Sequence, residues 1–149
     1  MTQVTQSEYS SNMQTFLPYA DFNETAKVLD YKRLGKQRVE AYQILRVLEG
    51  LTKGWRNHPA VLMWAGHEPA LAEYGRVICI EWIERGYNDT LLPKFELLAN
   101  ADNLPAWLGD ERLHTSHKSN LIRKDETFYA PKFPGIPNDL PYFWVVTKG

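Results

Sequence analysis

Four basic side chains are gathered within seven residues, just before a single carboxylate, Glu40. Cations attract phosphate groups, whereas a carboxylate suits a reaction that builds positive charge, such as cleavage of a glycosidic bond through an oxocarbenium-like state. The cations should also lower the pKa of Glu40 and keep it ionised. The stretch therefore predicts a phosphate-binding surface with a catalytic carboxylate at its centre. Its basic residues are Lys32, Arg33, Lys36 and Arg38.

The same stretch has the spacing of a helix face. Side chains that are three, four or seven positions apart share one side of an α-helix, which places Arg33, Lys36 and Glu40 on one stripe. The polar Gln37 and Gln43 lie on the same stripe. A solvated helix face with an ordinary ion pair between Lys36 and Glu40 would show the same pattern. Periodicity alone leaves both interpretations open.

A second basic group lies toward the C-terminal end, in HTSHKSNLIRK, residues 114–124. Its basic side chains can contact phosphates, although a basic surface helix without any ligand would look the same. The four histidines of the chain form no HExxH motif, and the single cysteine forms no CxxC motif. No metal and no cofactor is therefore predicted. The candidates for phosphate contacts in this group are His117, Lys118, Arg123 and Lys124.

Aromatic rings beside cations form a third feature. Trp55 precedes Arg56 in the loop TKGWRNHP, and Tyr129 lies three residues before Lys132. An unpaired nucleic-acid base stacks on a ring that has cations nearby, whereas most rings in a helical domain belong to the core. Both interpretations stay open for these rings. The binding candidates in these segments are Arg56, His58 and Tyr129.

Two long helices and several shorter ones must position these residues. Apolar periodicity predicts one helix over about 24–49, capped by Asn23 and ended by Gly50, and a second helix over 68–85. Gly35, inside the first helix, indicates close approach of another backbone. Shorter helices are expected at 59–64, around 94–100, and after a cap at Ser116.

Two segments are expected to pack without regular structure. The apolar stretch MQTFLPYADF, residues 13–22, should be extended, and the tail FYAPKFPGIPNDLPYFW holds four prolines and six aromatic residues. Such a tail cannot be a regular helix, yet it is too aromatic to be disordered. The predicted fold class is mainly α: a compact single domain built on two long helices, with shorter helices and an aromatic, proline-rich C-terminal wrap.

The length of 149 residues suits one domain, which we assign to residues 13–149, after a flexible polar leader at residues 1–12. No run of 18 apolar residues occurs, and the single Cys79 allows no internal disulfide. We therefore expect a cytoplasmic monomer without membrane contact, associated with the nucleoid if the protein is bacterial.

The net charge of −1 hides a segregation of charge along the chain. Residues 27–56 hold eight lysines and arginines against three acids, whereas residues 67–110 hold eight acids against three lysines and arginines. Such an arrangement predicts a basic face that can meet phosphates and an acidic face that does not.

Several motifs resemble the pyrimidine-dimer DNA glycosylase family (phage endonuclease V-like). They are LDYKRLGKQRVEA at 29–41, TKGWRNHP at 52–59 and EWIERGYND at 81–89, and the similarity extends over about residues 16–135. The resemblance implies a compact, mostly α fold that binds duplex DNA at damaged pyrimidines such as cyclobutane dimers. It also implies DNA repair by cleavage of the glycosidic bond, followed by strand cleavage at the abasic site, with Glu40 as the catalytic carboxylate.

The family's amine nucleophile is less simply placed. The resemblance implies an α-amine exposed by loss of the initiator methionine, which would be that of Thr2 here, although Thr2 lies 38 residues before Glu40. Lys32 or Lys36 could supply an amine instead if burial lowered its pKa. Without an amine, Glu40 could activate water, which would give a glycosylase without a lyase step.

Other functions remain open at this stage. The family's arginine before the catalytic glutamate is Val39 here, so the substrate could be another modified base. A DNA-binding module without catalysis would bind DNA in a salt-dependent way and release no base. A protein-interaction domain that uses the acidic face would not bind DNA at all.

Overall fold

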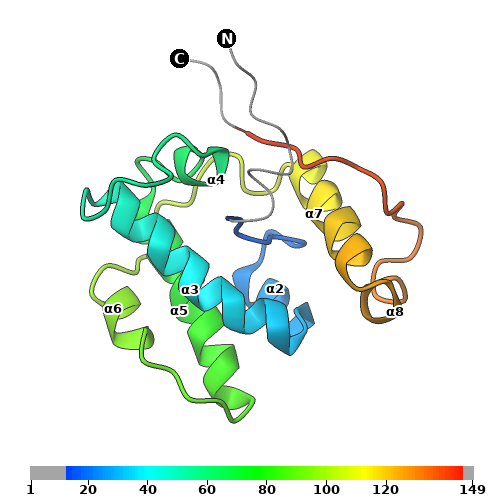
Figure 1. Ribbon diagram of the computed structural model, residues 1–149, viewed down its shortest axis with the longest axis horizontal. Helices are drawn as coiled ribbons and strands as arrows, with labels where there is room; N and C mark the ends of the chain where they lie inside the picture. Colours follow the sequence, from blue (N-terminus) through cyan, green and yellow to red (C-terminus); the bar gives the residue numbers. More distant parts are fainter. Residues whose placement is uncertain (1–12, 146–149) are drawn as a thin grey trace.

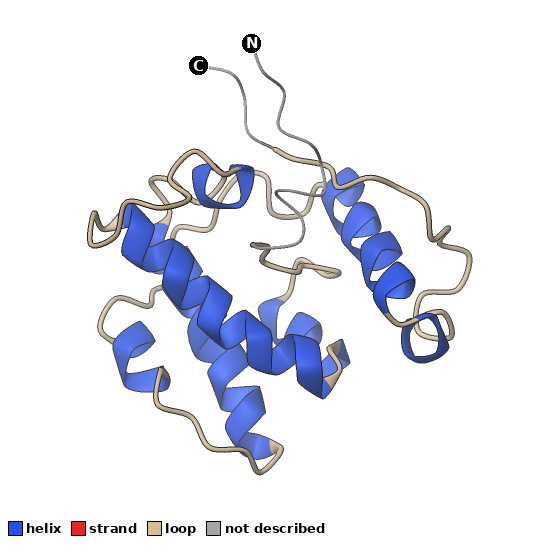
Figure 2. Ribbon diagram, viewed as in Figure 1, coloured by secondary structure: helices blue, strands red, loops and turns tan. Residues whose placement is uncertain are grey.

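The computed structural model describes residues 13–145, and every regular element in that range is a helix (Figures 1 and 2). The mainly α class is therefore confirmed, with α3 and α5 as the two long helices. The predicted leader lies outside the described residues. The helices are α2 (Phe22–Val28), α3 (Tyr31–Leu48), α4 (Pro59–Leu62), α5 (Glu68–Glu84), α6 (Leu92–Glu96), α7 (Glu111–Lys124) and α8 (Glu126–Tyr129).

The two long helices pack against each other, and α2 and α6 pack on α5. Glycines allow these close approaches. A Cβ atom on Gly35 of α3 would lie 2.7 Å from the ring of Trp82 on α5, so the predicted close approach is made by a side chain and not by a backbone. A Cβ on Gly75 of α5 would lie 2.3 Å from the ring of Phe95 on α6.

The first predicted helix is in fact two helices, because the chain bends at Leu29 and Asp30. Both residues have extended backbone angles, and the Asp30 carboxylate accepts the N–H of Lys32 to cap α3. An aspartate that caps the following turn interrupts the helix before it. Asp21 caps α2 in the same way, so the prediction of Asn23 as the cap is wrong.

The end of α3 is predicted correctly, since Gly50 has a positive φ of 79° directly after the last turn. The second long helix also has its predicted bounds within a residue. The helix that carries the second basic group does not begin at Ser116. Asp110 accepts the N–H of Arg112 and starts this helix, α7, earlier. The hydroxyl of Ser116 instead donates to the Leu113 carbonyl inside α7.

The N-terminal described segment, residues 13–17, bridges α3 and α7, and Figure 1 shows it between these two helices. The C-terminal tail runs back along α7, where the backbone N–H groups of Leu140 and Phe143 donate to Ser119 and Ser116. The predicted extended segment and the predicted wrap are therefore both observed. Within residues 13–145, no helix has the length and apolarity needed to cross a membrane.

Candidate active site

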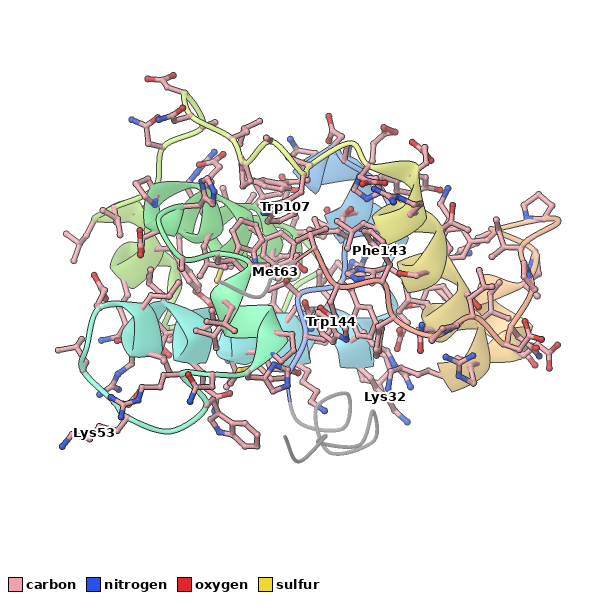
Figure 3. All side chains as sticks on the ribbon, turned by 90° about the horizontal axis from the view of Figure 1, so that it is seen from above. Lys32, Lys53, Met63, Trp107, Phe143 and Trp144 are labelled. Atoms are coloured by element: carbon pink, nitrogen blue, oxygen red, sulfur yellow. The ribbon has the colours of Figure 1, made fainter. Side chains whose placement is uncertain are left out.

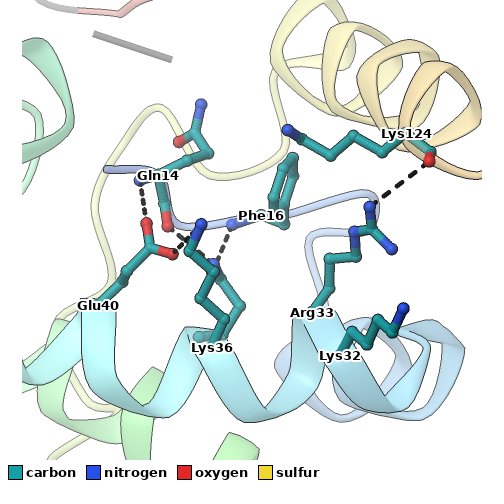
Figure 4. A pocket seen from close by; sticks show the side chains of 8 residues that line it. Gln14, Phe16, Lys32, Arg33, Lys36, Glu40 and Lys124 are labelled. Atoms are coloured by element: carbon teal, nitrogen blue, oxygen red, sulfur yellow. Dashed lines mark hydrogen bonds and ion pairs between the residues drawn. The ribbon is translucent and has the colours of Figure 1, made fainter. Parts of the chain in front are cut away.

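A pocket of about 190 Å³ opens between α3, the segment 13–17 and the last turn of α7 (Figure 4). It brings together residues that are distant in sequence, since α3 supplies the basic stretch and α7 supplies a lysine from the second basic group. Within residues 13–145, four cations and one carboxylate therefore share a single small site. The lining residues are Gln14, Phe16, Lys32, Arg33, Lys36, Gln37, Glu40 and Lys124.

Glu40 lines this pocket and is only 5% exposed. Its Oε1 accepts the backbone N–H of Gln14 at 2.8 Å, and its Oε2 lies 3.8 Å from the Lys36 ammonium. Burial raises the pKa of Glu40 above its ordinary value, and this outweighs the lowering by the Gln14 N–H, Lys36 and Lys124. The prediction that cations lower this pKa overall is therefore wrong, because desolvation of the carboxylate is the larger effect.

The segment 13–17, which binds Glu40 through Gln14, is held in place by Gln37, which is fully buried. Its Oε1 accepts the N–H of Phe16 at 2.8 Å, and its Nε2 donates to the Gln14 carbonyl at 2.9 Å. The hydroxyl of Tyr74 on α5 also lies within hydrogen-bond distance of Gln37 and of the Phe16 carbonyl. The helix face with Gln37 and Glu40 is thus covered by chain, so the solvated-face interpretation is wrong at these two residues.

Two histidines of α7 hold the next residue of that segment. His117 accepts the N–H of Leu17 at Nδ1, and His114 Nδ1 lies 2.8 Å from the Leu17 carbonyl oxygen. Complete burial lowers the pKa of His117 to about 3, so this ring is neutral near pH 7. The prediction of a phosphate contact for His117 is contradicted, because the ring is buried, uncharged and used to anchor the backbone.

The cations of the pocket differ in exposure. Lys36 is 62% exposed at its side chain, and Lys32 is also exposed. Arg33 is partly buried, since it pairs with Asp30 at 3.3 Å and also reaches the Lys124 carbonyl at 3.5 Å. The pKa of the Lys124 amine is lowered, first by burial and then by Arg33 and Lys36, with Glu40 acting in the opposite direction.

Arg38 does not line the pocket. Its guanidinium forms an ion pair with Asp89 at 2.5 Å and lies over the ring of Trp82, so it joins α3 to the loop after α5. Helix geometry explains this placement, since Arg38 and Glu40 are two residues apart and point to different sides of α3. The structure therefore separates Arg38 from the other three cations of its stretch.

Two more predicted contacts lie on α7 outside the pocket. Arg123 donates to the carbonyl oxygens of Asn138 and Leu140, which fastens the C-terminal tail. The ammonium of Lys118 lies over the rings of Tyr19 and Phe133 at 5.0 and 5.8 Å.

Two other predicted contacts are buried, which contradicts a direct role with DNA. The hydroxyl of Tyr129 donates to the Asp30 carboxylate and accepts the Asp30 N–H, and the ring is completely buried. His58 caps α4 by accepting the N–H of Ala60, and its ring is packed between those of Trp55 and Trp144. Aromatic composition could not distinguish these core positions from a stacking surface.

The loop before α4 differs from these buried positions, because the ring of its Trp55 is exposed. Trp55 is 48% exposed and has a φ of 68°, which is rare for a residue other than glycine. Lys53 and Arg56 on either side of it are also exposed. In Figure 3, Lys53 extends from the same side of the molecule as Lys32 of the pocket.

Gln14 and Phe16 are the pocket residues that sequence reasoning missed. Their segment was expected only to pack, and nothing local marks it as a wall of a site. The one available signal was Gln37, a polar residue on the same stripe as Glu40, which could have indicated a side chain that binds a backbone. Thr2 lies outside the described residues. Among the described residues, no group of three or more His, Cys, Asp or Glu side chains is placed to hold a metal ion.

A comparison with protein families matches residues 13–94, more than half of the chain, to the model described as pyrimidine dimer DNA glycosylase. The matched range contains the segment 13–17, α3 with Glu40, the Trp55 loop and α5. It ends before α7, so Lys124 lies outside it. Neither a search of curated proteins nor a search of solved structures gave a match.

Proposed function

Because the chain belongs to the pyrimidine dimer DNA glycosylase family, we propose that the pocket at Glu40 is its active site and that it cleaves the glycosidic bond of a damaged pyrimidine. Family membership implies glycosylase action on pyrimidine dimers in damaged DNA. The observation that carries the assignment to this pocket is a buried carboxylate surrounded by cations from two different helices. The pocket thus offers one anionic group for the sugar and several cationic groups for the flanking phosphates.

The charges of the pocket support this division of roles. In the free protein the cations would oppose positive charge at C1′ of the sugar. Phosphates that bind Lys32, Arg33 and Lys36 would neutralise these cations and leave the Glu40 carboxylate to face the developing charge. Burial strengthens that interaction, because fewer water molecules screen it. The raised pKa of Glu40 also suits proton transfer, since a catalytic carboxyl works best when its pKa approaches the working pH.

The depth of Glu40 requires the damaged nucleotide to leave the base stack. A carboxylate that is 5% exposed cannot reach C1′ in an undistorted duplex. Trp55 is a suitable partner in this step, because an exposed ring in a strained loop can stack on an unpaired base. Lys53 and Arg56 would bind the phosphates beside it.

Cleavage of the DNA strand after base release requires an amine that forms an imine with C1′. With such an amine the protein would be a bifunctional glycosylase and abasic-site lyase. If Glu40 activates water instead, only the glycosylase step would occur. The family's arginine before the glutamate is Val39 here, and Val39 is exposed on α3. A different modified base is therefore the alternative substrate.

The direct test is base release from duplexes that differ only at one site. One duplex carries a single cyclobutane thymine dimer, a second carries undamaged thymines, and further duplexes carry other modified pyrimidines. Alkali then converts any abasic site to a strand break. We expect breaks at the dimer and none in the undamaged duplex. Breaks only at another modified base would identify that base as the substrate instead of the dimer. Tight binding without any breaks would show that the protein is a DNA-binding module.

A further inference from the structure

The pocket that Glu40 lines also contains an amine from a different helix. Lys124 is the last residue of α7, and its side chain extends from that helix above the ring of Phe16, in the direction of Gln14 (Figure 4). The ammonium nitrogen is 5.9 Å from the centre of the Phe16 ring. Arg33 holds the position, because its guanidinium donates to the Lys124 carbonyl at the end of the helix.

The surroundings of Lys124 shift its equilibrium toward the neutral amine, which is the form that attacks carbon. Burial disfavours the ammonium ion, and the nearby charges of Arg33, Lys36 and Arg123 disfavour it further, so the pKa of Lys124 is lowered. A lysine placed next to other cations in a partly dry pocket is a known route to an amine nucleophile at neutral pH. Glu40 opposes the effect without outweighing it.

Among the residues that the structure describes, the other nitrogen atoms of the pocket are less suited to attack. Lys36 is largely exposed, and its ammonium is already paired with Glu40 at 3.8 Å. The Gln14 nitrogen is the one hydrogen-bonded to Glu40, but as part of a peptide bond its lone pair is delocalised. Arg33 offers a guanidinium, whose nitrogen lone pairs are delocalised and do not attack carbon. Lys32 is exposed on the first turn of α3.

We propose that the ε-amine of Lys124 is the nucleophile that attacks C1′ in this pocket and gives the protein abasic-site lyase activity. The inference rests on the proposed function. It goes beyond it by naming the reacting atom on a helix that the family match does not include.

The chemistry balances with groups that are already present. The Nζ lone pair forms a bond to C1′ as the bond from C1′ to the base breaks. The base keeps that electron pair and takes a proton from water, and in a cyclobutane dimer it stays joined to the neighbouring pyrimidine. The new ammonium gives one proton to Glu40. Glu40 then passes it to O4′ as the C1′–O4′ bond opens, which leaves a protonated imine between Lys124 and the sugar. Loss of a C2′ proton and of the 3′ phosphate completes strand cleavage by elimination.

Borohydride reduction tests the proposal, because it converts the imine to a stable secondary amine. The full-length protein is incubated with a duplex that holds one abasic site and, separately, with the dimer duplex, in the presence of borohydride. Digestion and mass spectrometry then locate the cross-link. We expect it on Lys124 with both duplexes. A cross-link on the N-terminal residue or on another lysine would overturn the proposal.

A matched pair of variants gives a second readout. Lys124→Arg keeps the charge but removes the amine, and we expect it to lose cross-linking by at least about a hundredfold while still binding DNA. Lys132→Arg, at an exposed lysine outside the pocket, should cross-link like the natural protein. Wild-type cross-linking by Lys124→Arg would overturn the proposal.

The two duplexes separate this inference from the proposed function. Base release from the dimer duplex with no cross-link would refute Lys124 as the nucleophile and leave the glycosylase standing. Cross-linking of Lys124 on the abasic duplex without base release from the dimer would support the amine and refute the proposed substrate.

Discussion

At the scale of single residues, Glu40 is the side chain whose environment makes least sense without a function. A glutamate that is almost completely buried must lose most of its hydration, and a hydrogen bond from Gln14 and a largely exposed lysine do not fully compensate for that loss. Strain of this kind is common where a group is placed for chemistry. The protein therefore has a measurable disadvantage in stability at Glu40.

This disadvantage leads to a prediction about pH. The pKa of Glu40 is higher in the folded protein than in the unfolded chain, so its contribution to stability is present below the unfolded pKa and is lost as the pH rises through the folded pKa. Glu40→Gln cannot ionise. Its free energy of unfolding, relative to that of the natural protein, should therefore rise from pH 4 to pH 7. The urea midpoints of both proteins at these two pH values measure the difference.

Glu49→Gln is the matched control, because Glu49 is exposed at the C-terminal end of the same helix. It should show no comparable change between the two pH values. The difference in stability between Glu40→Gln and the natural protein should shift in favour of the variant from pH 4 to pH 7. If it shifted in favour of the natural protein, the account of Glu40 as a buried charge would be wrong.

The basic residues and Glu40 were predictable from their types and spacing, but their environment was not. Nothing local to α3 shows that residues 13–17 cover Glu40, so the sequence pattern gives cations the larger influence on its pKa. His117 and Tyr129 were misassigned for the same reason, because their hydrogen-bond partners are 100 and 99 residues away.

At the scale of elements, the pocket depends on the hydrogen bonds that hold the segment 13–17 between α3 and α7. Gln37 binds it from α3, while His114 and His117 bind Leu17 from α7. The segment supplies Gln14 to Glu40 and Phe16 to Lys124, so its position sets the distance between the proposed acid–base group and the proposed nucleophile. Loss of either anchor would loosen both.

The His117 anchor predicts acid sensitivity. Its pKa is about 3 in the folded protein and 6.5 for an unperturbed histidine, so its contribution to stability is present above the unfolded value and is lost as the pH falls through the folded value. The loss approaches about 1.4 kcal/mol for each pH unit within this window. His117→Asn retains an acceptor for the Leu17 N–H but does not titrate, so it should flatten the pH dependence of stability between pH 6 and pH 4.

Urea denaturation across that range measures the slope. His67→Asn serves as the comparison, since His67 stands before α5 and makes no side-chain capping bond there. Its slope should match that of the natural protein. If the slope for His117→Asn equalled that of the natural protein, protonation of the His117 ring would not be coupled to unfolding.

Helix positions were the most predictable elements, because proline at the start and glycine at the end mark α4, α5 and the end of α3. The break at Asp30 was missed, since the same aspartate that caps α3 is also bound by Tyr129 from the other end of the chain. A long-range partner of this kind leaves no trace in local periodicity.

At the scale of the whole molecule, the segregation of charge seen in the sequence takes a specific form. Acids of α5 form ion pairs within their own helix, as in Arg76 with Glu73 and Arg85 with Glu81. Asp89 binds Arg38. These pairs reduce the charge that the acidic face offers to a protein partner, whereas the pocket and the Trp55 loop keep exposed cations such as Lys32 and Lys53 on one side.

The central claim is that Glu40, beside the cations of the pocket, is the catalytic carboxylate. Single-turnover cleavage of the dimer duplex tests this claim most directly. Glu40→Gln and Glu49→Gln are compared with the natural protein at saturating protein concentration, and DNA binding is measured in parallel. We predict that Glu40→Gln binds the dimer duplex normally but releases the base about 10²–10⁴ times more slowly, while Glu49→Gln behaves like the natural protein. Base release by Glu40→Gln at the natural rate would contradict the account.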